Sequence, residues 1–417
     1  MIRKHLFLTA AILAMPFSVE AQSLNTHIKG EISDTTARII VMNRVGVDTR
    51  TGRADTIPFR NGRFAYDLLT DGIEAMEVTA YNDRGSGSYV EFFAEGDTVS
   101  ITFPADGRAT WHATTPRNTE LTKVKQRVDD IIMKPLRERE RMEREGRDVT
   151  PEGKALKDRI IAAKTERNDS LVRVLANEAQ ALIKKGMLYT AEYSATEKSI
   201  DEAFHASFKY EMDYAQANPG HVGLLCLYNV SRKAKAGSKE GLEICDIYND
   251  VYDGKLSDFH LSEYMSAWCV SQQTRVGGRY YDFTAPDLYG KQHTLSEEIK
   301  GKIALIDLWA SWCGPCRRLS RSMIPVYEEY KDKGFTIVGV AREKKADDMR
   351  TAIRRDKYPW LNLLELNDRA KIWQHYGVGY SGGSTFLVDK DGKILAISPS
   401  AEEVRAILEK KGVRVVE

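Results

Sequence analysis

Three patterns of hydrophobic and polar positions follow one another along this chain of 417 residues. Between about Asn25 and His112, short runs of β-branched and aromatic residues alternate with turn signals such as Asn61-Gly62 and Asp71-Gly72. This pattern is typical of a small antiparallel β-sandwich or meander. We expect its strands at residues 28–32, 37–42, 63–68, 75–81 and 89–93.

From about Pro116 to Arg275 the pattern becomes helical. One apolar stripe runs along an otherwise charged segment and comprises Leu156, Ile160, Ala163, Leu171, Leu175 and Leu182. The dense charges of residues 137–147 indicate a solvent-exposed helix face rather than a binding tract. The sequence Asn218-Pro219-Gly220 predicts a break between two helices.

After Gly277-Gly278 strands and helices alternate. We expect strands at 303–308 and 335–340, helices at 313–333, 346–355 and 368–376, a hairpin of 385–388 with 394–397, and a last helix at 402–410. This order predicts an α/β domain with a central mixed sheet and helices on both faces. The chain length also requires more than one domain. The predicted organisation is therefore a signal peptide (1–21), a β-sandwich-like accessory domain (22–115), a helical region (116–277) and the α/β domain (278–417).

The sequence Trp312-Cys313-Gly314-Pro315-Cys316 lies where a predicted strand gives way to a helix. The unpaired N–H groups and the dipole at a helix start favour a thiolate, so we expect Cys313 to be the exposed, reactive cysteine. Cys316, one turn further on, can attack a mixed disulfide formed at Cys313. A zinc site would need two more ligands, and no second Cys-x-x-Cys or His-x-x-x-His follows, so no metal is expected. The motif predicts thiol–disulfide exchange.

Composition, the N-terminal segment and the remaining cysteines indicate the cellular compartment and the kind of partner. With 61 basic and 60 acidic residues the chain has no global basic field, and no nucleic-acid partner is expected. Arg3 and Lys4, then an apolar stretch and Val19-Glu20-Ala21, predict a secretory signal, with Gln22 as the first mature residue and no cysteine nearby for a lipid anchor. No later stretch is apolar enough for a membrane span, so a soluble periplasmic protein is expected. The other cysteines are expected to be buried hydrophobic side chains, with a bridge between two of them as the alternative: Cys226, Cys245 and Cys269.

Residues 285–411 resemble the thioredoxin-like thiol–disulfide oxidoreductases of the ResA/TlpA branch. The likeness rests on Ala285-Pro286-Asp287, the stretch 307–316, and Phe386-Leu387-Val388-Asp389. It implies a thioredoxin-like fold without a cofactor, in which Cys313 attacks and Cys316 resolves. It also implies that Asp307 is a buried acid that relays the proton of Cys316. Burial of a carboxylate on a core strand would independently raise its pKa towards neutrality, although a strand-end residue bonded to backbone is the alternative. The β-domain is similar to one of unknown function found before such modules in bacterial envelope proteins.

Two departures from that family concern the surroundings of the cysteine pair. The family has a cis-proline opposite the disulfide, whereas this chain reads Tyr380-Ser381-Gly382-Gly383-Ser384, which predicts a flexible substrate-docking loop. The strand at 335–340 offers no lysine near Asp307. We expect Trp309 and Trp312 to shape the surface around the disulfide. The predicted substrate-binding residues are Trp312, Gly314, Pro315, Gly383 and Ser384.

These features predict an exported reductase or isomerase of protein disulfides that a membrane electron donor regenerates. The resemblance suggests clients such as apocytochrome c or mis-paired envelope proteins. A peroxiredoxin-like peroxidase is the less favoured enzyme, because those enzymes carry a single peroxidatic cysteine in a Thr-x-x-Cys setting. A redox-sensing binding protein of the cell envelope is the alternative from another class.

Overall fold

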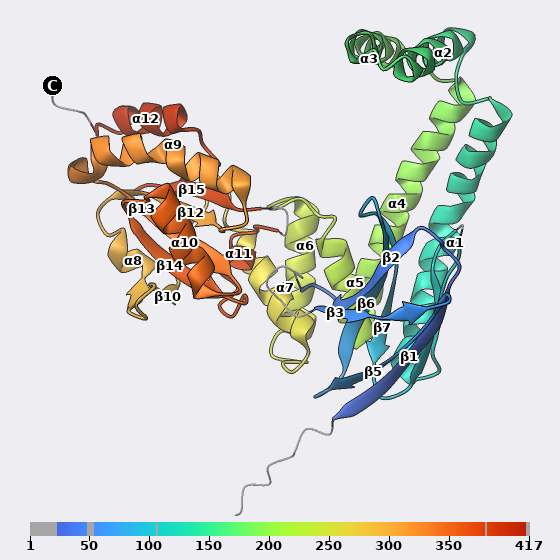
Figure 1. Cartoon of the computed structure of the whole chain (residues 1–417), viewed down its shortest axis with the longest axis horizontal. Helices are drawn as coiled ribbons and strands as arrows, with labels where there is room; N and C mark the ends of the chain where they lie inside the picture. The colour runs from blue at the N-terminus through green and yellow to red at the C-terminus, as the bar shows by residue number, and fades with distance from the viewer. Residues whose placement is uncertain (1–22, 48–53, 106, 380–381, 414–417) are drawn as a thin grey trace, which may run out of the picture.

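The computed structural model describes residues 23–47, 54–105, 107–379 and 382–413. Figure 1 shows the N-terminal strands and the C-terminal α/β domain at opposite sides of the molecule, with helices between them. The predicted signal peptide lies outside the described residues. The division of the chain at residues 115 and 277 stays a prediction. Within the described ranges, no helix has the length and the apolar character needed to cross a membrane.

The N-terminal strands form two sheets, with the orders β4-β5-β1-β8-β9 and β3-β2-β6-β7. Their bounds are β1 Leu24–Ile32, β2 Ala37–Arg44, β3 Ala54–Ile57, β4 Phe59–Arg60, β5 Arg63–Thr70, β6 Glu74–Asn82, β7 Gly87–Ala94, β8 Thr98–Phe103 and β9 Thr110–His112. The five predicted strands are all present. Alternate side chains such as Ile28, Val78 and Phe92 fill the space between the sheets, which makes the arrangement a sandwich. The pairing is antiparallel except between β1 and β8, which are parallel.

The middle of the chain is helical, as predicted. Its elements are α1 Pro116–Glu145, α2 Pro151–Thr165, α3 Asp169–Lys184, α4 Ala191–Ala217, α5 His221–Ser231, α6 Lys239–Ile247, η1 Tyr248–Tyr252 and α7 His260–Ser271. The apolar stripe belongs to two helices, because Asn168 caps the start of α3. Leu156 and Ala163 of α2 pack against Leu175 of α3 at the far end of α1 and α4 (Figure 1). The predicted break lies between α4 and α5.

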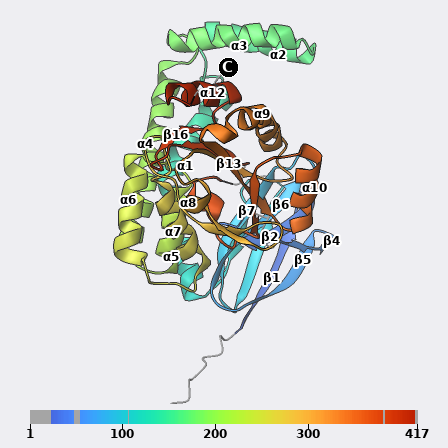
Figure 2. The same cartoon turned by 90° about the vertical axis from the view of Figure 1, so that its left-hand side faces the viewer.

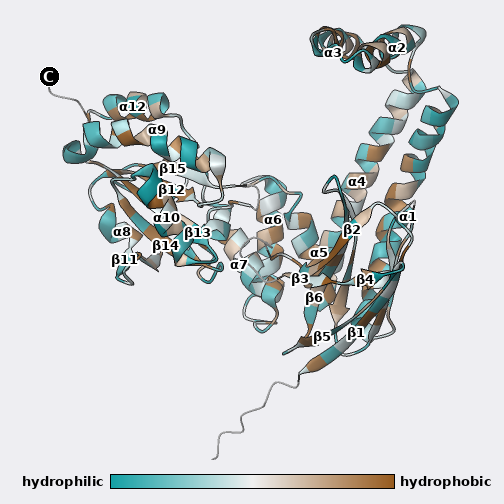
Figure 3. Ribbon diagram, viewed as in Figure 1, coloured by the Kyte–Doolittle hydropathy of each residue, from teal (hydrophilic) through white to brown (hydrophobic). Residues whose placement is uncertain are grey.

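One face of the second sheet packs against helices rather than against the first sheet. Val45, Ala75 and Phe93 share a core with apolar side chains of α5 such as Leu224 and Leu227. Hydrophobic residues are concentrated in the strands, whereas α1 carries many hydrophilic residues along its length (Figure 3). The sandwich and the helices are therefore joined through a common apolar contact.

A disulfide joins Cys245 of α6 to Cys269 of α7. The structure thus supports the bridged alternative for these two residues, and only Cys226 is the buried free thiol that the sequence suggested. Two cysteines 24 residues apart along the chain were able to meet because α6 and α7 pack together.

The C-terminal domain has one mixed sheet with the order β14-β13-β12-β15-β16. Its elements are β10 Thr284–Pro286, β11 Gln292–Thr294, α8 Leu295–Glu298, β12 Ile303–Trp309, α9 Gly314–Tyr330, η2 Lys331–Lys333, β13 Phe335–Glu343, α10 Ala346–Asp356, β14 Leu361–Leu366, α11 Ile372–His375, β15 Ser384–Val388, β16 Ile394–Ile397 and α12 Ala401–Lys410. The central strand β12 is parallel to β13 and antiparallel to β15. All its residues are buried, as expected for a strand covered on both faces.

Helices cover both faces of this sheet, as predicted (Figures 1 and 2). On one face, α9 is joined to α10 through the Arg317–Asp356 ion pair and to α12 through Arg405–Glu329. On the other, Phe386 of β15 contacts the ring of Tyr376, which follows α11. Helix α11 is shorter than the predicted 368–376, and β14 was not predicted. The same helix packs on α7, where Lys371 pairs with Glu263 at 3.1 Å.

Candidate redox site

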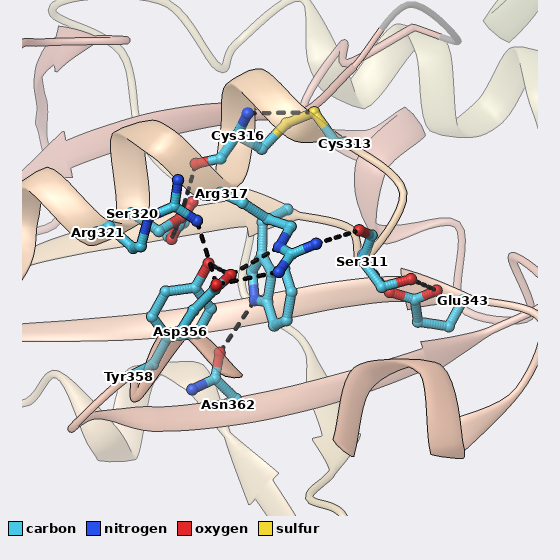
Figure 4. Close-up of polar contacts among 12 residues, drawn as sticks. Ser311, Cys313, Cys316, Arg317, Ser320, Arg321, Glu343, Asp356, Tyr358 and Asn362 are labelled. Atoms are coloured by element: carbon cyan, nitrogen blue, oxygen red, sulfur yellow. Dashed lines mark hydrogen bonds and ion pairs between the residues drawn. A yellow bond between two sulfur atoms is a disulfide. The ribbon is translucent and has the colours of Figure 1, made fainter. Parts of the chain in front are cut away.

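The cysteine pair lies at the junction of β12 and α9, as predicted. Cys313 is the N-cap of α9, and its sulfur accepts a hydrogen bond of 3.3 Å from the N–H of Cys316 (Figure 4). Pro315 occupies the first turn, where a missing N–H leaves no partner unsatisfied. The two sulfurs form a disulfide, so the structure shows the oxidised pair. The N–H of Cys316 at the helix start points at the Cys313 sulfur and, together with the helix dipole, would stabilise its thiolate after reduction.

Exposure does not distinguish the two cysteines. Cys313 is 6% exposed and Cys316 is 8% exposed, so the expectation that only Cys313 reaches the surface is wrong for the oxidised pair. Both line a cavity of about 260 Å³ together with Asp307, Leu308, Pro315, Leu319, Gly382, Gly383, Ser384 and Thr385. The disulfide is therefore adjacent to this cavity.

Asp307 lies in the core beneath the pair and is 2% exposed. The hydroxyl of Ser320 lies 2.7 Å from its Oδ2 and 3.0 Å from the carbonyl oxygen of Cys316, so a side chain rather than backbone holds the carboxylate. Burial raises the pKa of Asp307 to about 7, and the hydrogen bond from Ser320 opposes that rise. Within the described residues no cation pairs with Asp307. Asp307 is thus a group that can exchange a proton near neutral pH beside the buried sulfur.

The backbone of Gly383 is held against the cysteine pair. Its N–H donates a hydrogen bond of 3.2 Å to the sulfur of Cys316. A side-chain carbon on Gly383 would lie 1.8 Å from the carbonyl oxygen of Leu308, a distance that no real contact allows. The expectation of a flexible loop is therefore wrong at this residue, because pairing of β15 with β12 brings the backbones together. Tyr380 and Ser381 lie outside the described residues, and no cis peptide bond occurs among the residues described.

The two tryptophans of the motif have different roles. Trp309 is fully buried, and its Nε1–H donates to Oδ1 of Asn362 at 3.0 Å, so it does not shape the surface as predicted. The reason is that it is the last residue of the central strand β12 and points into the core below α9. Trp312 is 37% exposed and contacts Trp373 of α11, which fits the predicted place beside the disulfide.

A second layer of polar residues fixes the loop before Cys313, and the sequence did not reveal it. Glu343 of β13 accepts hydrogen bonds from the N–H of Ser311 at 2.5 Å and from its hydroxyl at 2.9 Å. Arg317 donates to the carbonyl oxygen of Ser311 at 3.2 Å and binds Asp356 through two nitrogens, at 2.6 and 3.0 Å (Figure 4). Both backbone groups of Ser311 are thereby satisfied, which restricts the loop. No sequence signal identifies these partners, because they are 32 and 39 positions away from the residues that they bind.

Only some of the predicted substrate-binding residues lie together at the cavity. Pro315, Gly383 and Ser384 line the cavity, whereas Trp312 and Gly314 do not belong to its lining. Leu319 and Thr385 were not predicted and lie at the cavity. Among the residues described, no three or more His, Cys, Asp or Glu side chains are grouped so as to hold a metal ion.

Comparison with known proteins agrees with this geometry. Residues 276–397 match the model of the AhpC/TSA family. The thiol-disulfide oxidoreductase ResA of Bacillus thuringiensis (strain Al Hakam) is 31% identical over 134 residues, which are 32% of this chain and 74% of that protein. The chain belongs to the ResA family of thiol-disulfide oxidoreductases.

Other relatives carry related names. The thiol:disulfide interchange protein DsbE of Allochromatium vinosum is 29% identical over 115 residues, which are 27% of this chain and 60% of that protein. The crystal structure of the thioredoxin domain of a thiol-disulfide oxidoreductase from Bacteroides vulgatus is 31% identical and covers 33% of this chain and 97% of that domain, with a TM-score of 0.31. The match to ResA and the family match at residues 276–397 show that the protein is a thiol–disulfide oxidoreductase with a ResA-type, thioredoxin-like C-terminal domain.

Proposed function

We propose that this oxidoreductase reduces protein disulfides. The Cys313 thiolate attacks one sulfur of a client disulfide, and the other client sulfur leaves as a thiolate that takes up a proton. Asp307 then accepts the proton of Cys316, whose thiolate attacks the sulfur of Cys313. The client's second thiolate leaves and the Cys313–Cys316 disulfide forms. Two electrons pass to the client, and a donor must return them before the next cycle.

The observation that carries the reducing direction is the buried carboxylate of Asp307 without a cation among the described residues. A strongly oxidising pair is one whose reduced, thiolate form is stabilised. Here Cys316 has to ionise beside a carboxylate that is itself half-ionised near neutral pH. The second negative charge is disfavoured, so the dithiol gives up its electrons readily.

An exported location supports a membrane donor as the source of these electrons. The Cys245–Cys269 disulfide fits an oxidising compartment, and the segment 1–21 reads as a secretory signal. We infer that the protein works in the periplasm, where a soluble thiol pool does not keep the pair reduced. Protein disulfides are the substrates that the names of the relatives suggest, and apocytochrome c or mis-paired envelope proteins are the clients that the family resemblance favours.

Reduction of insulin disulfides with dithiothreitol as the electron source tests this function. We expect turnover by the wild type, none by Cys313→Ala, and covalent mixed disulfides with clients for Cys316→Ala. The reduction potential of the pair should lie near roughly −270 mV, as in reducing thioredoxins, and a value near about −120 mV would contradict the reducing direction. Absence of insulin turnover would favour the redox-sensing binding protein, and rapid consumption of peroxide would favour the peroxidase.

A further inference from the structure

Strand β7 is an edge strand of its sheet, which has the order β3-β2-β6-β7. In an antiparallel pair, alternate residues direct both backbone groups towards the neighbouring strand or away from it. The carbonyl of Ser86 accepts from Asn82, so even-numbered residues of this hairpin face β6. Odd-numbered residues, including Tyr89 and Glu91, therefore direct their N–H and C=O groups outwards.

The outward-facing backbone N–H and C=O of Phe93 show what kind of partner this strand edge binds. The side-chain amide of Asn118 in α1 accepts from the N–H of Phe93 and donates to its carbonyl oxygen, both at 2.8 Å. This exchange of two hydrogen bonds is the one that a residue of a neighbouring antiparallel strand would make. Asn118 is fully buried and occupies one end of the edge. In the part of the chain that the structure describes, no hydrogen bond reaches the outward backbone groups of Tyr89 or Glu91.

A groove of about 710 Å³ runs beside these unpaired groups. One wall is formed by residues 108–111, where the N–H of Ala109 donates to the Ser88 hydroxyl, and the other by α1 and the end of α5. Figure 1 shows α1 beside β7, and Lys125 of α1 pairs with the Glu91 carboxylate at 3.0 Å. The groove contains the apolar side chains of Trp111, Leu121, Val124 and Val128. Its volume lies within the range of ligand sites in proteins.

One ion pair joins the two walls of the groove, and a segment that enters the groove must separate it. Arg108 pairs with Asp129 at 3.0 Å, with side chains 63% and 52% exposed. Exposed pairs of this kind contribute little stability, so the pair can open for an incoming chain. Tyr89 is itself 56% exposed at the mouth of the groove.

We propose that the β7 edge binds an extended segment of a client polypeptide as an additional strand. Main-chain hydrogen bonds to Tyr89 and Glu91 would provide affinity with little sequence preference, and the apolar side chains of the groove would contact alternate side chains of the client. Non-native proteins with wrong or unwanted disulfides expose such segments. That the bound segment belongs to a client protein rests on the proposed function. That the β7 edge binds an extended strand does not depend on it. The protein thus has a client-holding site apart from the disulfide.

A second copy of the chain fits this edge less well. Two β7 edges could pair only if both left their grooves, because residues 108–111 and α1 flank each edge. A single extended segment can enter between the walls.

The test uses the mature chain with Cys313→Ser and Cys316→Ser, so that no covalent capture occurs, and reduced, carboxamidomethylated ribonuclease A as the unfolded probe. Backbone hydrogen exchange is measured residue by residue. We expect the amide of Tyr89 to exchange at least about tenfold more slowly with the probe present, as hydrogen-bonded strand amides do. The amide of Val90, which already faces β6, is the internal control.

Two variants at Tyr89 distinguish the contribution of its backbone N–H to probe binding from that of its side chain. Tyr89→Pro removes the outward N–H, and proline is accepted on an edge strand because the ladder to β6 stays intact. It should weaken probe binding by roughly fivefold to tenfold, the effect of one lost backbone hydrogen bond. Tyr89→Val keeps the N–H and should bind within about twofold of the parent. With the cysteines restored, both variants should reduce glutathione disulfide at the wild-type rate.

Equal exchange of the Tyr89 amide with and without the probe would overturn the proposal, as would equal affinities of the proline and valine variants. Protection of Tyr89 that depends on protein concentration without any probe would show self-pairing and would also overturn it. If Tyr89→Pro does not fold, the exchange experiment on the parent chain decides. Loss of insulin reduction in the wild type would refute the proposed reductase and leave the exchange result standing. Insulin turnover without Tyr89 protection would refute the strand-binding edge alone.

Discussion

The Ser320 hydroxyl donates a hydrogen bond of 2.7 Å to Oδ2 of Asp307. Ser320 is fully buried on α9, one turn after Cys316, and its Oγ also lies 3.0 Å from the Cys316 carbonyl oxygen. The same hydroxyl therefore joins the acid on β12 to the helix that carries the cysteine pair. Hydrogen bonding to an ionised carboxylate favours its charged form, so this contact sets how far burial can raise the pKa of Asp307.

The Asp307→Asn variant should be more stable than the wild type at pH 8. An aspartate ionises near 3.8 when unfolded and near 7 in this fold, so the unfolded state releases its proton first as the pH rises. The wild type therefore loses stability between about pH 4 and pH 7, on the order of 4 kcal/mol in all, and asparagine does not titrate. Urea unfolding from pH 3 to pH 8 measures this, with the exposed Asp347→Asn as control. A stability difference that does not change with pH would contradict the raised pKa.

The same Asp307→Asn variant should resolve mixed disulfides slowly near neutral pH. Asparagine cannot accept the proton of Cys316, whereas the ionised fraction of Asp307 increases as the pH passes about 7. The deficit should shrink towards pH 9, because a cysteine thiol ionises unaided near about 8.5. Stopped-flow release of a fluorescent thiol from a preformed mixed disulfide reports the resolving step. A deficit that is constant with pH would leave Asp307 a structural residue.

Ser320→Ala should move the pH dependence of the resolving step to higher pH. Loss of the hydrogen bond to Oδ2 removes the contribution that lowers the pKa of Asp307. The rising limb of the rate profile should therefore shift upwards, while the rate at high pH approaches that of the wild type. Ser322→Ala, at an exposed hydroxyl of the same helix, is the matched control. An unchanged profile would show that Asp307 does not limit the step.

Gly383→Ala should both destabilise the protein and disturb the Cys313–Cys316 pair. A methyl group there would overlap the carbonyl oxygen of Leu308, and overpacking of this kind lowers the free energy of unfolding by about 1–3 kcal/mol. The displaced backbone would also withdraw the N–H from the sulfur of Cys316 and change the reduction potential. Gly379→Ala has open space and should do neither. Calorimetry with redox titration checks both effects, and equal behaviour of the two variants would contradict the close approach.

Replacing Cys245 and Cys269 together by alanine should lower the free energy of unfolding by about 3 kcal/mol, because the bridge closes a loop of 24 positions in the unfolded chain. Insulin reduction should continue, since the Cys313–Cys316 pair is a separate disulfide. Denaturant unfolding and the insulin assay measure the two effects. Loss of turnover in a folded double variant would show that the α6–α7 bridge takes part in the reaction.

Much of the C-terminal fold was predictable because the pattern that identifies each element is local in the sequence. The apolar run of β12, the helical spacing after Cys316 and the turn at Asp391-Gly392 each depend on neighbours within a few positions. The missed strand β14 has a mixed polar and apolar pattern that resembles neither a buried nor an alternating strand. The short helix α11 was overestimated because Lys371 before it has a left-handed backbone, which the sequence did not signal.

The sequence by itself determined the succession of a β-rich, a helical and an α/β region, the place of the cysteine pair at a helix start and the buried position of Asp307. These follow from local spacing, from helix electrostatics and from the cost of burying a carboxylate. Only the tertiary structure decided that Ser320 holds Asp307, that Glu343 anchors Ser311, and that Gly383 donates to Cys316. Each of these contacts joins different elements, and their formation depends on how α9 packs on the sheet and how β12 pairs with β13 and β15. Such contacts have no local periodicity, so nothing in the order of residues could reveal them.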